Sequence, residues 1–171
     1  MTLKDKIKTL IKRIQYKRYI EEHRTYIKKA FIELTDCLGL SEYFMDDEIY
    51  YKLQNRIQNH DMSKYSEEEF EPYRKQYYPI NTQEKENNKD TFQKAWVHHL
   101  ECNDHHWQHR QNNKIFDKET MIAILENVCD WLAMGYKFHD RPYQYYEKHK
   151  NEIHLPEEDR KFLEKIIYII K

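Results

Sequence analysis

Glycine is almost absent from this chain: Gly39 and Gly135 are its only two glycines in 171 residues. A phosphate-binding P-loop or a dinucleotide-binding fingerprint needs several glycines, because its backbone adopts positive dihedral angles and approaches the phosphates closely. Neither loop can be built from this sequence. None of the three serines lies in a Gly-x-Ser-x-Gly motif, so the nucleophile elbow of a serine hydrolase is also unsupported.

Apolar residues recur at helical spacing along nearly the whole sequence, and no segment shows the alternation of a half-buried strand. The sequence therefore predicts an all-α fold. A chain of this length can bury a core without disulfides, so we expect a single-domain bundle of about seven to eight helices over residues 1–171. The first two are expected over residues 1–18, as a basic amphipathic helix, and from about Tyr19 to Leu38.

Local signals predict where several later helices begin. Asp46 or Asp47 is expected to open a helix through Ile57, and Asp117 is expected to cap another. The run from Ser66 to Glu69 has the form of a capping box for a short helix. Residues 81–90 are expected to form a polar connection, with the next helix starting near its end.

Charge and cysteine content limit the partners and the compartment. The formal net charge of −1 gives the whole chain no preference for nucleic acid or anionic membranes. Its three cysteines are odd in number and form no Cys-x-x-Cys pair, which favours reduced thiols. No segment has the character of a secretory signal or of a membrane-spanning helix. We therefore expect a cytoplasmic protein that does not bind nucleic acid.

The first eighteen residues are locally basic. Asp5 is the only acidic residue before Glu21, among seven cations: Lys4, Lys6, Lys8, Lys12, Arg13, Lys17 and Arg18. Such a helix can hold a membrane surface or a nucleic-acid backbone. We favour the alternative that its charges form the solvated side of a helix whose apolar face, from Leu3 to Ile14, packs on the core.

Histidine is concentrated in the segment AWVHHLECNDHHWQH, which has five histidines within residues 95–109. Because imidazole titrates near neutrality and needs a polar partner when buried, such a cluster suggests metal ligation or proton transfer. A solvated surface loop is the alternative. The pairs are His98-His99 and His105-His106, and the sequence does not decide which member of each pair faces inward.

Further ionisable residues occupy inward-facing positions on predicted helices. His23 lies between the apolar positions Ile20 and Ile27, and His60 continues the apolar stripe that includes Ile57. Asp130 shares a helix face with Glu126, which can orient a ligand, accept a proton or form a surface salt bridge. A metal cation would compensate buried imidazoles and carboxylates. Mixed nitrogen and oxygen ligands suit Mn, Fe, Zn, Co or Ni.

The order of these residues resembles the HD-domain superfamily of metal-dependent phosphohydrolases. The segment QNHDMSKY resembles its HD-x-x-K variant, and the match runs from His23 through His60-Asp61 to Asp130. Three further segments, HDMSKYSEEEF, AWVHHLECNDHHWQH and ENVCDWLAMGY, also resemble a small uncharacterised family of bacterial and phage proteins.

The superfamily resemblance implies an HD-like helical domain with one or two divalent transition metals. It implies that the first metal is held by His23, His60, Asp61 and Asp130, and that His99 and His106 help to hold a second. Asp61 and Lys64 would be catalytic, and Lys64, His98 and His105 would bind a small phosphorylated substrate such as a nucleotide.

Two other functions fit the same residues. A helical di-iron oxygenase uses similar His and Asp ligands, and a metal-stabilised binding protein would need no catalytic activity. Single residues also have simpler interpretations. His23 alone would fit a core histidine, Lys64 a solvated lysine, and the second His-Asp pair of the chain, His139-Asp140, a chance dipeptide.

Overall fold

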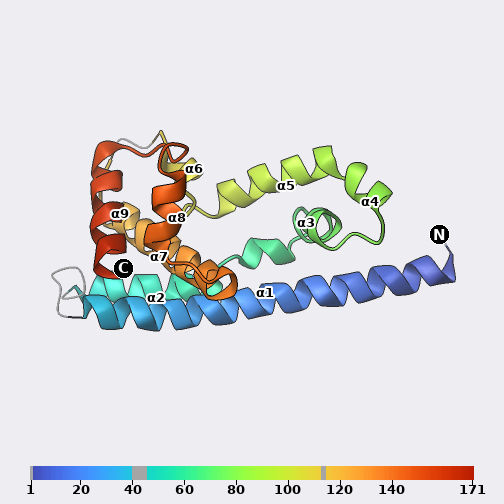
Figure 1. Cartoon of the computed structure of the whole chain (residues 1–171), viewed down its shortest axis with the longest axis horizontal. Helices are drawn as coiled ribbons and strands as arrows, with labels where there is room; N and C mark the ends of the chain where they lie inside the picture. Colours follow the sequence, from blue (N-terminus) through green and yellow to red (C-terminus); the bar gives the residue numbers. More distant parts are fainter. Residues whose placement is uncertain (1, 40–45, 113–114) are drawn as a thin grey trace. The chain divides into compact units, whose positions relative to one another are not determined.

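A computed structural model describes residues 2–39, 46–112 and 115–171, and every regular element in these ranges is helical. The predicted all-α class is confirmed. In chain order (Figure 1) the elements are α1 (Leu3–Leu38), α2 (Asp47–Asn59), the 3₁₀ helix η1 (Met62–Tyr65), α3 (Phe70–Tyr77), α4 (Thr82–Glu86), α5 (Lys89–Cys102), α6 (Trp107–Arg110), α7 (Lys118–Phe138), α8 (Pro142–His149) and α9 (Glu157–Ile169).

Helix α1 is longer than the sequence pattern predicted. The expected division into one helix over residues 1–18 and another from Tyr19 to Leu38 is wrong, because the structure has a single helix of 36 residues. Nothing near Tyr19 ends a helix: the segment from Ile14 to Ile20 contains no glycine, proline or capping residue. The charge pattern and the apolar face both change along this one helix, and that change resembles the boundary between two helices.

The chain divides into two compact units. Unit 1 comprises Met1–Glu22 and Asp61–Asn103, and unit 2 comprises His23–His60 and Asp104–Lys171. The first boundary falls inside α1, so this helix contributes residues to both units. The prediction that residues 1–171 form one domain stays a prediction, because the chain enters each unit twice and neither is a continuous segment.

Unit 1 is built on the packing of α3 against α5 and of both against η1. Its buried apolar residues come from α1, α3 and α5: Tyr16, Ile20, Tyr73 and Ala95. Arg74 is fully buried beside them and is paired with Glu84 at 2.8 Å. Glu84 belongs to α4, a helix capped by the side chain of Asn81. The polar connection predicted over residues 81–90 therefore contains a short capped helix that the prediction did not include.

Unit 2 is organised around α7, which packs against α2, α8 and α9. Most of α7 is apolar on every side, as expected of a helix surrounded by others. Asp117 caps it by accepting a hydrogen bond from the Thr120 backbone N–H, and Asp46 caps α2 in the same way through Glu48. Both predicted helix starts are confirmed, because each depends on a contact within the first turn.

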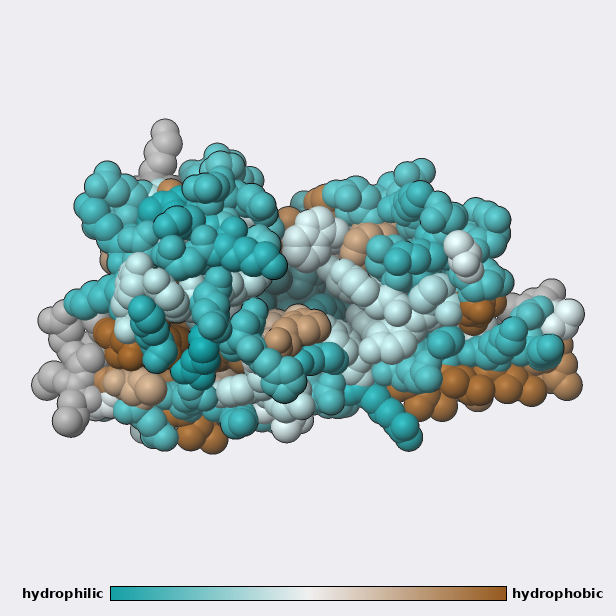
Figure 2. Space-filling view, in the orientation of Figure 1, coloured by the Kyte–Doolittle hydropathy of each residue, from teal (hydrophilic) through white to brown (hydrophobic). Residues whose placement is uncertain are grey.

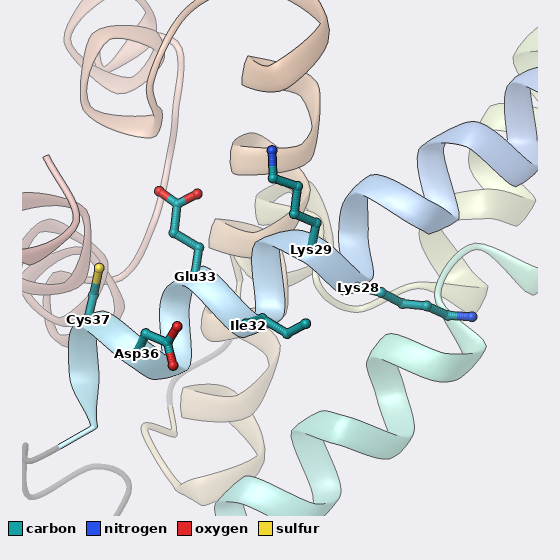
Figure 3. A pocket seen from close by; sticks show the side chains of 6 residues that line it. All are labelled: Lys28, Lys29, Ile32, Glu33, Asp36 and Cys37. Atoms are coloured by element: carbon teal, nitrogen blue, oxygen red, sulfur yellow. The ribbon is translucent and has the colours of Figure 1, made fainter.

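The surface of unit 2 includes a pocket of about 440 Å³ (Figure 3). It is lined by six residues, all from α1: Lys28, Lys29, Ile32, Glu33, Asp36 and Cys37. None of them is a candidate metal ligand. The chemistry predicted from the sequence therefore lies elsewhere.

The three cysteines differ in exposure, which gives a direct test of the fold. Cys37 and Cys102 are exposed, whereas Cys129 on α7 is buried, and burial raises the pKa of its thiol well above the ordinary value. Because the thiolate is the reactive form, we expect two thiols to react rapidly with Ellman's reagent in the native protein and three in denaturant. Rapid reaction of all three in the native protein would contradict the packing of α7.

Candidate metal centre

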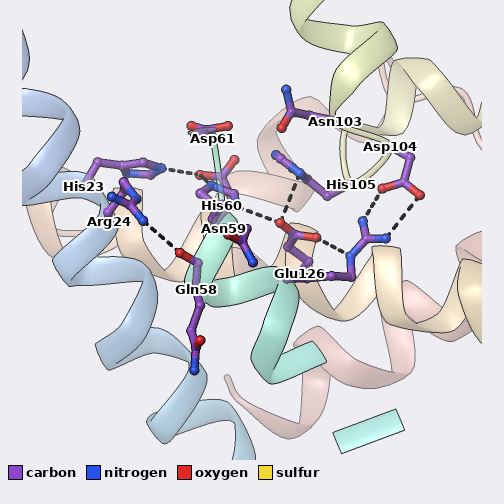
Figure 4. A network of polar contacts seen from close by, with 12 residues as sticks. His23, Arg24, Gln58, Asn59, His60, Asp61, Asn103, Asp104, His105 and Glu126 are labelled. Carbon is purple, nitrogen blue, oxygen red and sulfur yellow. Dashed lines mark hydrogen bonds and ion pairs between the residues drawn. The ribbon is translucent and has the colours of Figure 1, made fainter. Parts of the chain in front are cut away.

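Unit 2 brings together four predicted site residues from different elements, and Figure 4 labels the three histidines among them. His23 lies on α1, His60 ends α2, His105 lies in the turn before α6, and Asp130 lies on α7. The three imidazoles are buried, and the side chain of Asp130 is 16% exposed. The sequence placed His23, His60 and Asp130 in one metal site, and the structure brings these three together.

The ligand atoms of this cluster are close to one another. His23 Nε2 lies 3.1 Å from Asp130 Oδ1, and His60 Nε2 lies 3.9 Å from the same oxygen. One ligand atom each from His60, His105 and Asp130 falls within 4.8 Å of the others. Two metal ligands at bond lengths near 2 Å are separated by about 3 to 4 Å, so this spacing is compatible with a shared cation.

Glu126, four residues before Asp130 on α7, contacts the Nδ1 atoms of two of these imidazoles. Its Oε1 lies 2.8 Å from His60 Nδ1 and 3.4 Å from His105 Nδ1. Since a carboxylate only accepts hydrogen bonds, His60 donates from Nδ1 to Glu126, and Nε2 is the ring nitrogen that faces Asp130. Histidines that bind metals commonly donate their second ring N–H to a carboxylate, which fixes the tautomer and the ring orientation.

The charge of Glu126 is balanced on its other side. Arg56 Nε donates to Glu126 Oε2 at 2.6 Å, and its guanidinium also pairs with Asp104. Burial alone would lower the pKa of Arg56, but the hydrogen bond to Asp104 and the charge of Glu126 raise it instead. Glu126 is only 4% exposed. It is therefore a buried partner of the histidines and not the surface salt bridge that the sequence left open.

The donor set of this cluster fits a divalent transition metal. The imidazole nitrogens of His60 and His105 and an oxygen of Asp130, with His23 Nε2 beside that oxygen, match the preferences of Zn, Mn, Fe, Co or Ni better than those of Mg or Ca, which prefer oxygen. Buried imidazoles and the buried carboxylate of Glu126 are costly unless they are hydrogen-bonded, paired with opposite charge or coordinated to a metal. The cluster in unit 2 can therefore hold a metal ion, whose identity the ligands do not fix.

Of the pair His105-His106, the structure brings His105 into the cluster. His105 is buried, whereas His106 is half-buried and precedes the short helix α6. The sequence assigned His106 to a metal and His105 to substrate. Their ring centroids are 4.2 Å apart, so His106 borders the cluster, and His105 has the contacts of a ligand.

Unit 1 gathers the other predicted residues. Asp61 follows the end of α2 with a φ of 57°, a left-handed conformation that aspartate tolerates better than most residues. Its side chain is buried, with Oδ1 lying 3.4 Å from His99 Nε2 and Oδ2 accepting a hydrogen bond from Lys64 at 2.5 Å. Lys64 therefore bonds directly to a site residue and is not a freely solvated lysine.

Glu69 contacts the Nδ1 atoms of two histidines in unit 1, as Glu126 does in unit 2. It is fully buried, and its two oxygens accept hydrogen bonds from His98 Nδ1 and His99 Nδ1, both at 2.8 Å. Burial would raise the pKa of Glu69, but these bonds from His99 and His98 hold it below the ordinary value. His99 Nδ1 thus faces Glu69, and its Nε2 faces Asp61.

The predicted capping role of Glu69 is wrong. Glu69 immediately precedes α3, but its side chain does not cap that end of the helix, because the carboxylate contacts two imidazoles of α5 instead. One group of side chains within unit 1 that could hold a metal joins Glu69 to His98 and Cys102. Cys102 Sγ lies 3.7 Å from His98 Nε2, at an exposed position on α5.

Sequence reasoning missed three charged residues that support the clusters. Arg56 and Asp104 were not singled out, and Glu69 was assigned to a helix cap. Arg56 lies on α2 one residue before Ile57 and one helical turn before His60, which is the available sequence signal. A lysine or arginine beside a predicted ligand is common on any helix, so that signal becomes informative only when contacts are known.

The comparisons with known proteins place the chain in a family. Residues 12–169 match a family of unknown function, DUF5662, and the chain belongs to this family. No curated protein and no solved structure matches it. The family boundaries include every residue of both clusters, from His23 to Asp130.

Proposed function

We propose that this chain is a metal-dependent phosphohydrolase that acts on a nucleotide or another small phosphoester. The observation that carries the proposal is the set formed by the buried His23, His60 and His105 and the partly buried Asp130 in unit 2, with Glu126 in contact with two of the imidazoles. The superfamily resemblance of the His60-Asp61 dipeptide and of Lys64 supplies the reaction class.

A bound divalent cation would lower the pKa of water enough to supply a nucleophile near neutral pH. Hydrolysis then needs no serine or cysteine nucleophile, in keeping with the absence of a nucleophile elbow. In the overall reaction the phosphorus–oxygen bond to the leaving group breaks, and water supplies the hydroxyl on the phosphate and the proton on the leaving group. The metal would be Mn, Fe, Zn, Co or Ni, as one or two ions.

The chain's own residues have separate tasks in this proposal. Glu126 keeps the proton of His60 on Nδ1, so that Nε2 remains a ligand. In unit 1, Asp61 and His99 would hold a second cation, and His106 stays a candidate ligand beside His105. Lys64 and His98 would neutralise charge that develops on the phosphoryl oxygens, because both are half-buried cations or donors held by carboxylates.

The two His-Asp dipeptides of the chain allow a matched test. Purified protein supplied with manganese should release phosphate or nucleoside from a panel of nucleotides. The double variant His60→Asn, Asp61→Asn should lose at least about 100-fold in kcat/KM. The control is His139→Asn, Asp140→Asn, because His139 is exposed and, like Asp61, has a left-handed backbone that asparagine tolerates.

Turnover that survives the change at residues 60 and 61 would contradict the proposal. Absence of turnover with every nucleotide would also count against it. A chain that takes up two iron ions per molecule and develops a visible band in air would belong to the oxygenase class instead.

A further inference from the structure

The N-terminal turns of α1 carry an exposed apolar stripe that neither cluster involves. Its members follow helical spacing and include Leu3 (75% exposed) and Leu10 (59%); the others are Ile7, Ile11 and Ile14, each at least 45% exposed. The amphipathic pattern of the sequence predicted that this face packs on the core. That expectation is wrong, and Figure 2 shows apolar atoms along this part of α1 at the surface.

The stripe is exposed because α1 uses its opposite face to pack within unit 1. Tyr16 and Ile20 are buried against α3 and α5 residues, including Tyr73 and Ala95. Tyr16 follows Ile7 by nine positions, and at 100° per residue this separation places the two side chains about 180° apart. Packing of Tyr16 into unit 1 therefore turns Ile7 and its neighbours away from the unit.

Basic residues flank the stripe. Residues 1–18 hold seven lysines and arginines against the single acidic residue Asp5, a local charge of +6, although the whole chain has a net charge of −1. One of the cations, Arg13, is already paired with Glu71 at 2.8 Å. Asp5 bonds to Thr2 within the same turn. An apolar face bordered by lysines is the pattern of a helix that lies in the interface of an anionic bilayer.

We propose that this part of α1 binds the surface of an anionic lipid bilayer. Its apolar side chains would enter the boundary between headgroups and acyl chains, and its lysines would contact the lipid phosphates and carboxylates. The helix would lie along the surface, because no helix in the described parts of the chain is long and apolar enough to cross a bilayer.

Charge decides against two other occupants of this face. A second copy packed through the same stripe would bring two segments of charge +6 together. With no acidic residues to pair with these cations, the repulsion between the two segments disfavours such a dimer. Nucleic acid would neutralise the lysines but leave the five apolar side chains in water. A bilayer with anionic lipids can bury the apolar side chains and also pair with the lysines.

Binding should also require little reorganisation. Residues 3–38 form one helix whose Tyr16 face is already packed in unit 1. Free amphipathic peptides must form their helix at the membrane, at a cost in conformational entropy. In this chain the segment is already helical in the folded protein, so that entropy is lost on folding and not on binding. The inference does not depend on the metal clusters or on the proposed phosphohydrolase activity.

Vesicle flotation of the full chain tests the proposal. Wild-type protein should float with vesicles of phosphatidylcholine and phosphatidylserine at low salt, and should bind pure phosphatidylcholine vesicles at least about tenfold more weakly. Sodium chloride at 0.5 M should weaken binding to the anionic vesicles, because it screens the lysines. The variant Ile7→Glu, Ile11→Glu should lose about tenfold or more of the anionic binding.

The matched control makes the same charge change at exposed isoleucines elsewhere. Ile32→Glu with Ile115→Glu changes two side chains that are 59% and 66% exposed, and it should bind as the wild type does. Circular dichroism should give the wild-type helical spectrum for both double variants if they remain folded. Equal binding by the two variants, equal binding to neutral vesicles, or a wild-type dimer that Ile7→Glu, Ile11→Glu dissociates would each overturn the proposal.

Discussion

Replacement of His60 by asparagine is expected to abolish tight binding of a divalent transition metal by unit 2. His60 is 1% exposed, its Nδ1 bonds to Glu126 at 2.8 Å, and its Nε2 faces Asp130. Loss of this ligand should cost more than the about 10- to 100-fold in affinity that loss of an outer hydrogen-bond partner costs. Competition titration of Zn²⁺ or Co²⁺ against a chromophoric chelator measures the change.

His139→Asn is the matched control for this prediction. His139 is exposed beyond the end of α7 and belongs to neither cluster. Its replacement should leave the affinity unchanged. If His60→Asn bound metal as tightly as His139→Asn does, the cluster in unit 2 would not be the metal site.

Glu126→Gln is expected to lower the affinity for metal by about 10- to 100-fold without removing a ligand. Glutamine keeps the size of the side chain but loses the negative charge that Arg56, His60 and His105 share. His60 would then be free to place its proton on Nε2, the nitrogen that faces Asp130. Cobalt binding should therefore weaken, and the visible spectrum of the bound Co²⁺ should change.

The control for this change is Glu119→Gln on the same helix. Glu119 is 58% exposed and pairs with Lys52 at the surface, so its replacement should alter neither the affinity nor the cobalt spectrum. Urea unfolding of both variants separates positioning from stability. A Glu126→Gln protein that lost stability but kept the wild-type cobalt affinity and spectrum would show that Glu126 supports the fold alone.

Helix starts were predictable from the sequence where a local contact sets them. Asp46 and Asp117 each cap a helix through a backbone N–H two or three residues away, so the sequence contains both partners. The long helix α1 was divided in error, because its apolar stripe from Leu3 to Ile14 and its buried residues from Tyr16 onward lie on different faces. Only tertiary packing tells which face is covered.

The candidate site was predictable to the level of residue type and helix face. His23 and His60 were found because each continues an apolar stripe, and their burial follows from that position. Asp130 was found because it shares a helix face with Glu126. The choice between His105 and His106 was not accessible, because both lie beyond the end of α5 where helical register no longer applies. Contacts between elements fix that choice.

The two buried glutamates show a different limit. Glu126 was noticed because it shares a helix face with Asp130, whereas Glu69 follows two other glutamates and fits a capping pattern. Its role depends on His98 and His99, about thirty positions later. A carboxylate that orients histidines from a distant segment carries no local sequence signature.

The most direct test of the central claim is the metal content of the purified chain. Protein expressed in medium with trace metals and purified without chelator should contain at least one equivalent of a transition metal by inductively coupled plasma mass spectrometry. The variant with His60→Asn and Asp130→Asn should contain at least one equivalent less. Wild-type protein that carries no metal, and takes up none when Mn, Fe, Zn, Co or Ni is supplied, would contradict the account.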